Sequence, residues 1–221
     1  MAEYLTARIK MVENQLRANK VTDEPLIEAM RTCPRESFVP HAKRSVAYAD
    51  EDLAIAPGRA LMEPMLFARL AQLAEIDNQD LVLDVGAGCG YGAAVLARLA
   101  SAVVALEEDE TLAGMAGNAL ADLGDGAGDN VVVETGPLPD GWPNQAPYDV
   151  IFLEGAIERR PSALLEQLAE GGRLVAMQRG PSGVQRGTLY LKRNGVVAER
   201  AVFDGATPVL PGFAAAPAFS F

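Results

Sequence analysis

Apolar residues follow a helical period over much of the first 75 residues. They recur every three or four positions in residues 4–16, 26–30 and 66–73, which is the spacing of a helix with one buried face. Asp23 precedes the second segment and Pro25 lies in its first turn, as is typical of a helix start. Residues 34–64 lack this period and contain several prolines, so the sequence predicts a long loop of the kind that often carries function.

From residue 81 onward, short apolar runs alternate with helical segments. The runs cover residues 81–85, 102–106, 131–133, 150–153 and 173–177, and helical patterns fill 91–99, 111–120 and 162–169. This alternation predicts βαβ units and a parallel sheet that is covered on both faces. The last two runs, 188–192 and 196–203, flank a hairpin signal at Asn194 and Gly195. The sequence therefore predicts an α/β fold with a seven-stranded, mostly parallel sheet that ends in an antiparallel hairpin.

These patterns divide the chain into two parts of one domain. Residues 1–78 are expected to form a helical N-terminal extension with the long loop, and residues 79–221 the sheet. A length of 221 residues suits a single domain with a hydrophobic core of its own.

Net charge and hydropathy argue against nucleic acid and membranes as binding partners. The chain has 19 Lys+Arg against 30 Asp+Glu, a formal net charge of −11, and such a surface repels nucleic acid and anionic membranes. No apolar stretch reaches the roughly 20 residues of a membrane-spanning helix, and the N-terminus lacks the apolar region of a signal peptide. We expect a cytoplasmic protein that binds neither nucleic acid nor membrane.

Cysteine and histidine are too scarce for the usual metal sites. Cys33 and Cys89 lie far apart, and His41 is the single histidine. A zinc site needs several such ligands at short spacing, and a disulfide framework needs more cysteines. We therefore expect no metal and a reducing compartment.

A glycine-rich turn follows the first run of the predicted sheet. Residues 83–91 read Leu-Asp-Val-Gly-Ala-Gly-Cys-Gly-Tyr, at the strand end where open α/β sheets bind ligands. Glycines let the backbone turn tightly and approach a ligand closely. The candidate cofactor-binding residues of this turn are Asp84, Gly86, Ala87, Gly88, Gly90 and Tyr91.

Two carboxylates discriminate between cofactors. Asp84 would repel the pyrophosphate of NAD, whereas a sulfonium ligand without phosphate would not be repelled. Glu107 ends the second strand, where an acidic side chain binds ribose hydroxyls. Together with the terminal hairpin, these residues favour S-adenosylmethionine, and a nicotinamide oxidoreductase remains the alternative from another class.

Several blocks of the chain resemble the protein-L-isoaspartate O-methyltransferases. The blocks are residues 35–40 with 47–50, the turn at 84–91, and residues 141–149, 164–168 and 171–175. The resemblance implies a class I methyltransferase fold and methyl transfer from S-adenosylmethionine to the side-chain carboxylate of isoaspartyl residues in damaged proteins. It also implies a protein or peptide substrate and a monomeric enzyme.

The loop before the third helix departs from the pattern of that family. The family's loop usually reads G-Q-T-I-S-Q-P, and here residues 58–64 read Gly-Arg-Ala-Leu-Met-Glu-Pro. Ala60 and Met62 replace the two hydroxyl residues, and Glu63 adds a negative charge that Arg59 could neutralise by pairing with it. Arg59, Met62 and Glu63 are therefore the substrate-loop candidates. The departures leave open a changed substrate or a non-catalytic cofactor-binding or interaction module.

Two further positions differ from the family pattern. Pro137 stands within the family's G-D-G segment, which holds the adenosine end, and Glu154 replaces a threonine after the fourth strand. Cys89 is expected to pack in the turn rather than to react.

Overall fold

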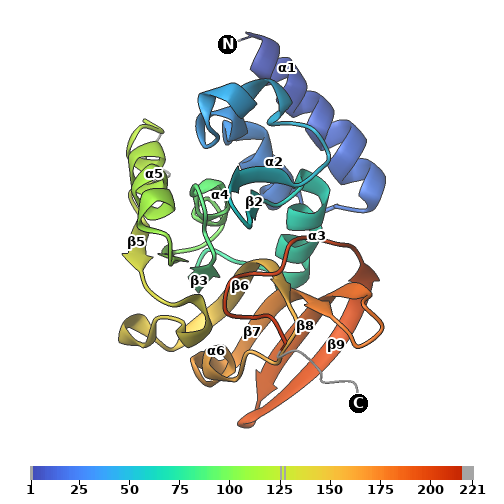
Figure 1. Cartoon of the computed structure of the whole chain (residues 1–221), viewed down its shortest axis with the longest axis vertical. Coiled ribbons are helices and arrows are strands. Elements are labelled where there is room, and N and C mark those ends of the chain that lie inside the picture. Colours follow the sequence, from blue (N-terminus) through green and yellow to red (C-terminus); the bar gives the residue numbers. More distant parts are fainter. Residues whose placement is uncertain (1, 125, 127, 216–221) are drawn as a thin grey trace.

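The computed structural model describes residues 2–124, 126 and 128–215. A sheet runs through the molecule, with helices α1 and α2 grouped at one end and the terminal strands β8 and β9 at the other (Figure 1). Among the described residues, no helix is both long enough and apolar enough to cross a membrane.

The large sheet has the predicted strands in the order β5-β4-β3-β6-β7-β8-β9. Strands β3 to β7 pair in parallel, and β8 runs antiparallel to both β7 and β9. Their bounds are β3 Leu81–Val85, β4 Ala102–Glu107, β5 Val131–Thr135, β6 Tyr148–Ile157, β7 Leu168–Arg179, β8 Gln185–Arg193 and β9 Val196–Asp204. This confirms the predicted class of fold and its antiparallel end.

The described part of the chain contains six α-helices. They are α1 Ala2–Met11, α2 Glu24–Thr32, α3 Pro64–Ala74, α4 Tyr91–Leu96, α5 Glu110–Ala121 and α6 Ser162–Glu166. The Asp23 carboxylate caps α2 as predicted, because it accepts a hydrogen bond from the Leu26 N–H at 3.1 Å. The helices predicted over 91–99 and 162–169 end earlier. The second helix ends early because strand β7 begins at Leu168, which pairs with Tyr148 of β6.

The first predicted helix is only partly buried. Val12 and Leu16 lie in the core as the apolar period predicts, but they form a π-helical turn after α1. Leu5 and Ile9, which belong to the same apolar stripe, are 52% and 44% exposed. The apolar period therefore predicted a helix correctly but overestimated how much of that helix is buried.

Alternating side chains of the strands divide the core into two halves. Val82 of β3 and Phe152 of β6 face a cluster that includes residues of α2, α3 and α4. Leu83 and Leu153 face the opposite cluster, which includes the buried leucines of α6. Because successive strand residues point to opposite faces, Asp84 lies on the same face as Val82.

Part of the segment predicted as an irregular loop is a small hairpin. Strands β1 (Leu53–Ala56) and β2 (Arg59–Leu61) pair antiparallel, with Pro57 and Gly58 in the turn. The sequence did not predict this hairpin because its strands, of four and three residues, are too short to show a two-residue period. Pro57 in the turn also made the segment resemble an irregular loop.

Arg173 of β7 joins the end of α3 to the sheet, and its removal tests this junction. Its guanidinium donates to the Ala74 carbonyl oxygen at 2.6 Å and pairs with Asp80 at 2.6 Å, both side chains being largely buried. We predict that Arg173→Ala lowers the free energy of unfolding by about 2–4 kcal/mol, because Asp80 and the carbonyls lose their partner. Urea denaturation measures this change.

The matched control is Arg186→Ala, which removes an exposed ion pair with Asp204. Exposed pairs contribute little, so we expect a loss below about 1 kcal/mol. Equal losses in the two variants would contradict the role given to Arg173.

Candidate functional site

Three buried carboxylates gather at the carboxyl ends of adjacent strands. Asp84 of β3 is level with Ala105 of β4 and Phe152 of β6. Glu107 and Glu154 each lie two residues further along their strands, so the alternation of side chains places all three on one face. Their exposed fractions are 0%, 0% and 5%.

The glycine turn runs from β3 to α4 beside these carboxylates. Gly86, Gly88 and Gly90 have φ angles of +81°, +55° and +88°, a region that residues with a Cβ rarely adopt. The turn is fixed to β4, because the Gly86 N–H donates to the Leu106 carbonyl at 2.9 Å. The Gly88 N–H donates to Glu107 Oε2 at 2.7 Å. The predicted turn thus brings the glycines and Glu107 together.

Glu107 is also paired with a cation from the β1–β2 hairpin. Both guanidinium Nη atoms of Arg59 donate to the Glu107 carboxylate, Nη2 reaching Oε2 at 2.7 Å. Arg59 Nη2 also donates to the Gly86 carbonyl at 3.0 Å. Arg59 is 6% exposed, so the ion pair is buried directly over the turn.

The expected pairing of Arg59 with Glu63 is wrong. Glu63 lies at the start of α3, where its N–H donates to Asp52 Oδ1 at 2.9 Å. Partial burial, together with the charges of Asp50 and Asp52, raises the pKa of Glu63 to about 7. Arg59, on strand β2, pairs instead with Glu107, which is distant from it in sequence.

Asp84 and Glu154 form a carboxyl pair without a cation of their own. Among the described residues, neither Asp84 oxygen accepts a hydrogen bond, and Glu154 Oε1 likewise has no partner. Burial raises the pKa of Asp84 to about 7, and burial with the charge of Asp84 also raises the pKa of Glu154. A Cβ at Gly92 would lie 1.9 Å from Glu154 Oε1, so a glycine in the first turn of α4 makes room for this pair.

Apolar side chains from two segments cover the glycine turn. A Cβ at Gly86 would lie 2.8 Å from Leu210 Cδ2, and one at Gly88 would lie 2.9 Å from Ile55 Cδ1. Leu210 is held in place because its N–H donates to the Ala156 carbonyl at 2.8 Å. The cavity beside the turn measures only about 10 Å³. Arg59, Ile55 and Leu210 therefore fill the space over the turn.

Comparison with known proteins places this chain in a family. Residues 7–204 match the model of the family described as protein-L-isoaspartate(D-aspartate) O-methyltransferase (PCMT). The chain belongs to this family. The prediction of an S-adenosylmethionine-dependent methyltransferase is thereby confirmed.

Individual relatives agree with the family match. A protein-L-isoaspartate O-methyltransferase 2 of an Anaeromyxobacter species is 43% identical over 178 residues, which cover 80% of this chain and 72% of the relative. A protein-L-isoaspartate O-methyltransferase of Opitutus terrae is 41% identical over 192 residues, or 85% and 79%. A solved protein-L-isoaspartate O-methyltransferase has a TM-score of 0.79 and 26% identity, covering 93% of this chain and 66% of that one.

Other residues singled out in the sequence are buried or half-buried near the candidate site. Met62 and Cys89 have no exposed surface, and burial raises the pKa of Cys89 to about 12. Tyr91 packs its ring at 5.8 Å from that of Phe38. Trp142 lies next to Gly136, where a Cβ would be 3.2 Å from its ring.

Arg35 is a structural residue of the site that sequence reasoning did not single out. Its guanidinium donates to the carbonyls of Ala47 and Met62, each at 2.7 Å, and lies 4.7 Å from the centre of the Tyr91 ring. Its place in the block at residues 35–40 was the available signal. Arg35 fixes the end of the hairpin loop against α4.

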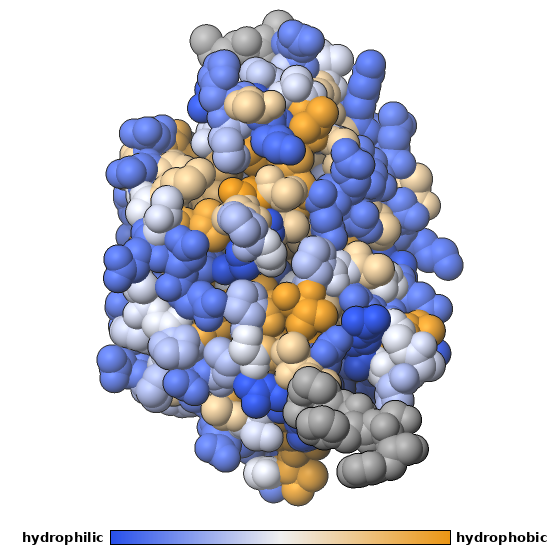
Figure 2. All heavy atoms as spheres, in the orientation of Figure 1, coloured by the Kyte–Doolittle hydropathy of each residue, from blue (hydrophilic) through white to orange (hydrophobic). Residues whose placement is uncertain are grey.

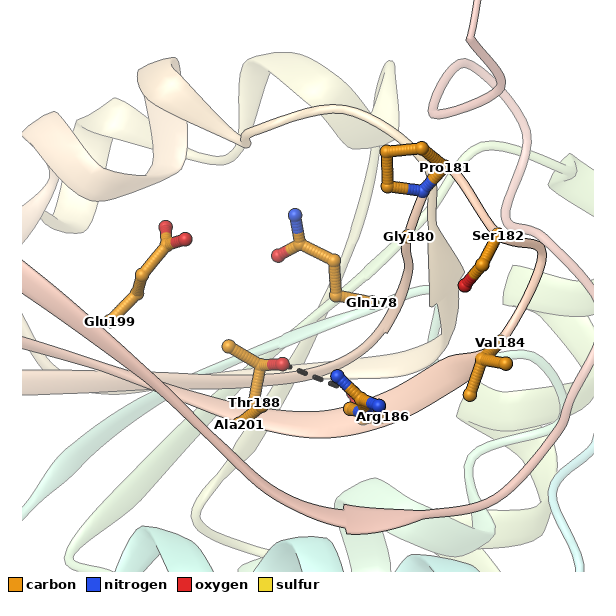
Figure 3. Close-up of a pocket in the computed structure, with 9 residues that line it drawn as sticks. All are labelled: Gln178, Gly180, Pro181, Ser182, Val184, Arg186, Thr188, Glu199 and Ala201. Carbon is orange, nitrogen blue, oxygen red and sulfur yellow. Dashed lines mark hydrogen bonds between the residues drawn. The ribbon is translucent and has the colours of Figure 1, made fainter.

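The more open hollows of the surface lie elsewhere. One groove of about 290 Å³ follows the end of β7 and is lined by residues such as Gln178, Ser182 and Glu199 (Figure 3). None of the predicted site residues lines it. Figure 2 shows charged and polar residues over most of one face, with apolar residues in smaller patches.

The Asp84–Glu154 pair predicts a pH-dependent stability. An aspartate with an ordinary pKa of 3.8 that titrates near 7 in the fold binds its proton more tightly when folded. The pair therefore stabilises the fold in acid, and this contribution is lost as pH rises from about 4 through about 7. The pKa of Glu154 is raised in the same direction by burial and by the charge of Asp84, so Glu154→Gln, which removes this second carboxyl, should reduce the pH dependence of stability by about 1–3 kcal/mol.

The measurement is urea denaturation of both proteins at pH 5 and pH 8. The difference between the two proteins isolates the pair from other titrating groups, Glu63 included. Parallel pH profiles for wild type and variant would refute the raised pKa assigned to the buried Glu154.

Proposed function

We propose that this chain transfers a methyl group from S-adenosylmethionine to the side-chain carboxylate of isoaspartyl residues in proteins. The observation that carries the proposal is the setting of Glu107. Its carboxylate accepts hydrogen bonds from the N–H groups of Gly88, Glu108 and Asp109 at 2.7, 2.9 and 3.1 Å. These bonds fix it at the end of the second strand of the sheet, the position at which such folds bind ribose.

The residues of the turn fit the cofactor in charge and backbone shape. Asp84 and Glu107 offer negative charge to a ligand that carries a sulfonium and no phosphate. Gly86 and Gly88 have no Cβ, so the backbone is available once the side chains above it move. Asp84, Gly86, Ala87, Gly88, Gly90 and Glu107 would hold the cofactor, whereas Tyr91 supports the turn from the core.

The reaction requires little acid–base catalysis from the protein. S-adenosylmethionine supplies an electrophilic methyl group, and a side-chain carboxylate is already ionised at neutral pH. The chain's contribution is to orient the carboxylate and to exclude water. The β1–β2 hairpin and the segment around Leu210 lie over the turn, so they are the segments that would cover a bound cofactor.

An acidic substrate needs a cation in an otherwise acidic site. Among the residues that line the cavity beside the turn, Arg59 is the cation and Glu154 the acid. We therefore assign the substrate carboxylate to Arg59. Glu63 lies in the same loop and disfavours additional negative charge near the isoaspartyl residue, while Met62 contributes packing.

The remaining expectations extend this proposal. We place the enzyme in the cytoplasm as a monomer that acts on protein or peptide substrates and binds no nucleic acid. Cys33 and Cys89 are buried and not joined to each other in a disulfide, which supports a reducing compartment. Within the single domain, residues 1–78 would form the substrate side and residues 79–221 the cofactor side.

Transfer of a labelled methyl group tests the proposed reaction. With saturating S-adenosylmethionine, we expect label in a peptide that contains isoaspartate and none above background in the matched aspartyl peptide. The reason is that only the isoaspartyl linkage shortens the side chain and repositions its carboxylate. Scintillation counting of the separated peptides gives the result.

Binding of S-adenosylmethionine must be measured together with methyl transfer, because a protein that binds the cofactor without transferring methyl differs from one that does not bind it. Label in neither peptide, although calorimetry shows that S-adenosylmethionine binds, would favour the non-catalytic module. Such a module is the second candidate because the hydroxyl residues of the family loop are replaced by Ala60 and the buried Met62.

A further inference from the structure

With Arg59 in place, all hydrogen-bond acceptor positions of the Glu107 carboxylate are occupied, although the proposed function needs this carboxylate to bind ribose. Oε1 accepts from Arg59 and from the N–H groups of Glu108 and Asp109. Oε2 accepts from Arg59 and from the Gly88 N–H. A carboxylate has about four acceptor sites. A ribose hydroxyl can therefore bind Glu107 only after the Arg59 guanidinium has left.

Arg59 belongs to an element that is fixed at its base and exposed at its tip. Leu53 and Leu61 at the base of the hairpin are 6% and 2% exposed, whereas Pro57 and Gly58 at the tip are exposed. Within the part of the chain that the structure describes, the two strands of the hairpin pair with each other and form no ladder with the large sheet. Its upper part can therefore move without breaking the hydrogen bonds of the sheet.

The same hairpin also supplies the apolar cover of the turn. Ile55 of β1 reaches Gly88, and Arg59 of β2 reaches both Glu107 and the Gly86 carbonyl. Displacement of the hairpin would remove both side chains from the turn together. The ion pair is the strong polar contact in this closure, since its two charges are buried and hydrogen-bonded at two points.

We propose that the Arg59–Glu107 ion pair holds the hairpin closed, and that the cofactor binds by exchanging ribose hydroxyls for the Arg59 guanidinium. This inference rests on the proposed function, because it assumes the cofactor site at Glu107. The exchange also releases Arg59 at the edge of the site, where it can meet the substrate carboxylate. One side chain thus serves the closed state and the substrate complex in turn.

The exchange lowers the apparent affinity for the cofactor. When only a fraction of molecules is open, the apparent dissociation constant equals the intrinsic one divided by that fraction. Arg59→Gln removes the charge that holds the hairpin closed and restores the residue of the family's usual loop. The variant should therefore bind S-adenosylhomocysteine, the methyl-free product, more tightly than wild type does.

Isothermal titration with S-adenosylhomocysteine tests the exchange without relying on activity. We expect the dissociation constant of Arg59→Gln to be about tenfold lower than that of wild type, a usual size for coupled conformational equilibria. Arg59→Lys keeps the charge but not the two-point contact, so its dissociation constant should lie between them. It also provides a second variant if Arg59→Gln folds poorly, which circular dichroism would reveal.

Arg173→Gln is the matched control, because Arg173 also forms a two-point pair, with Asp80, but away from the glycine turn. Its dissociation constant should equal that of wild type. Equal or weaker binding by Arg59→Gln would overturn the exchange and leave the proposed function intact. Absence of binding by wild type and all folded variants would overturn the cofactor site itself, and the proposed function with it.

Discussion

Buried negative charge is the constraint on which the site depends. Asp84, Glu107 and Glu154 converge at the ends of three neighbouring strands, and each is shielded from water. A buried carboxylate must be paired or protonated, because its desolvation is costly. Glu107 is paired with Arg59, while burial raises the pKa values of Asp84 and Glu154 and so favours their protonated forms. These two solutions explain why Arg59 reaches across from the hairpin and why a glycine occupies position 92.

The same constraint connects the fold to the proposed chemistry. An acidic pocket suits a cationic cofactor but opposes a carboxylate substrate, so the reaction requires a positive group that is present only when needed. Arg59 meets this requirement if the ribose of the cofactor takes its place on Glu107. The hairpin is then closed when the ion pair is formed and open when it is broken. This change is local, because the hairpin forms a sheet of its own and the large sheet keeps its hydrogen bonds.

Much of the fold was predictable because its signals are local. The buried strands show as continuous apolar runs, the cap of α2 shows as Asp23, and the turn between β8 and β9 shows as Asn194 and Gly195. Asp84 and Glu107 were also found, since strand ends are recognisable in the sequence. The partner of Arg59 was not, because Glu63 is close in sequence whereas Glu107 is close only after the sheet has formed. The pairing of Glu154 with Asp84 likewise depends on the placement of β6 beside β3.

A crystal structure of this chain with S-adenosylhomocysteine tests the central claim most directly. We expect that both ribose hydroxyls donate to Glu107 and that the Arg59 guanidinium no longer contacts it, with Ile55 displaced from Gly88. Density showing the ligand bound elsewhere, while Arg59 still donates to both oxygens of Glu107, would contradict the account.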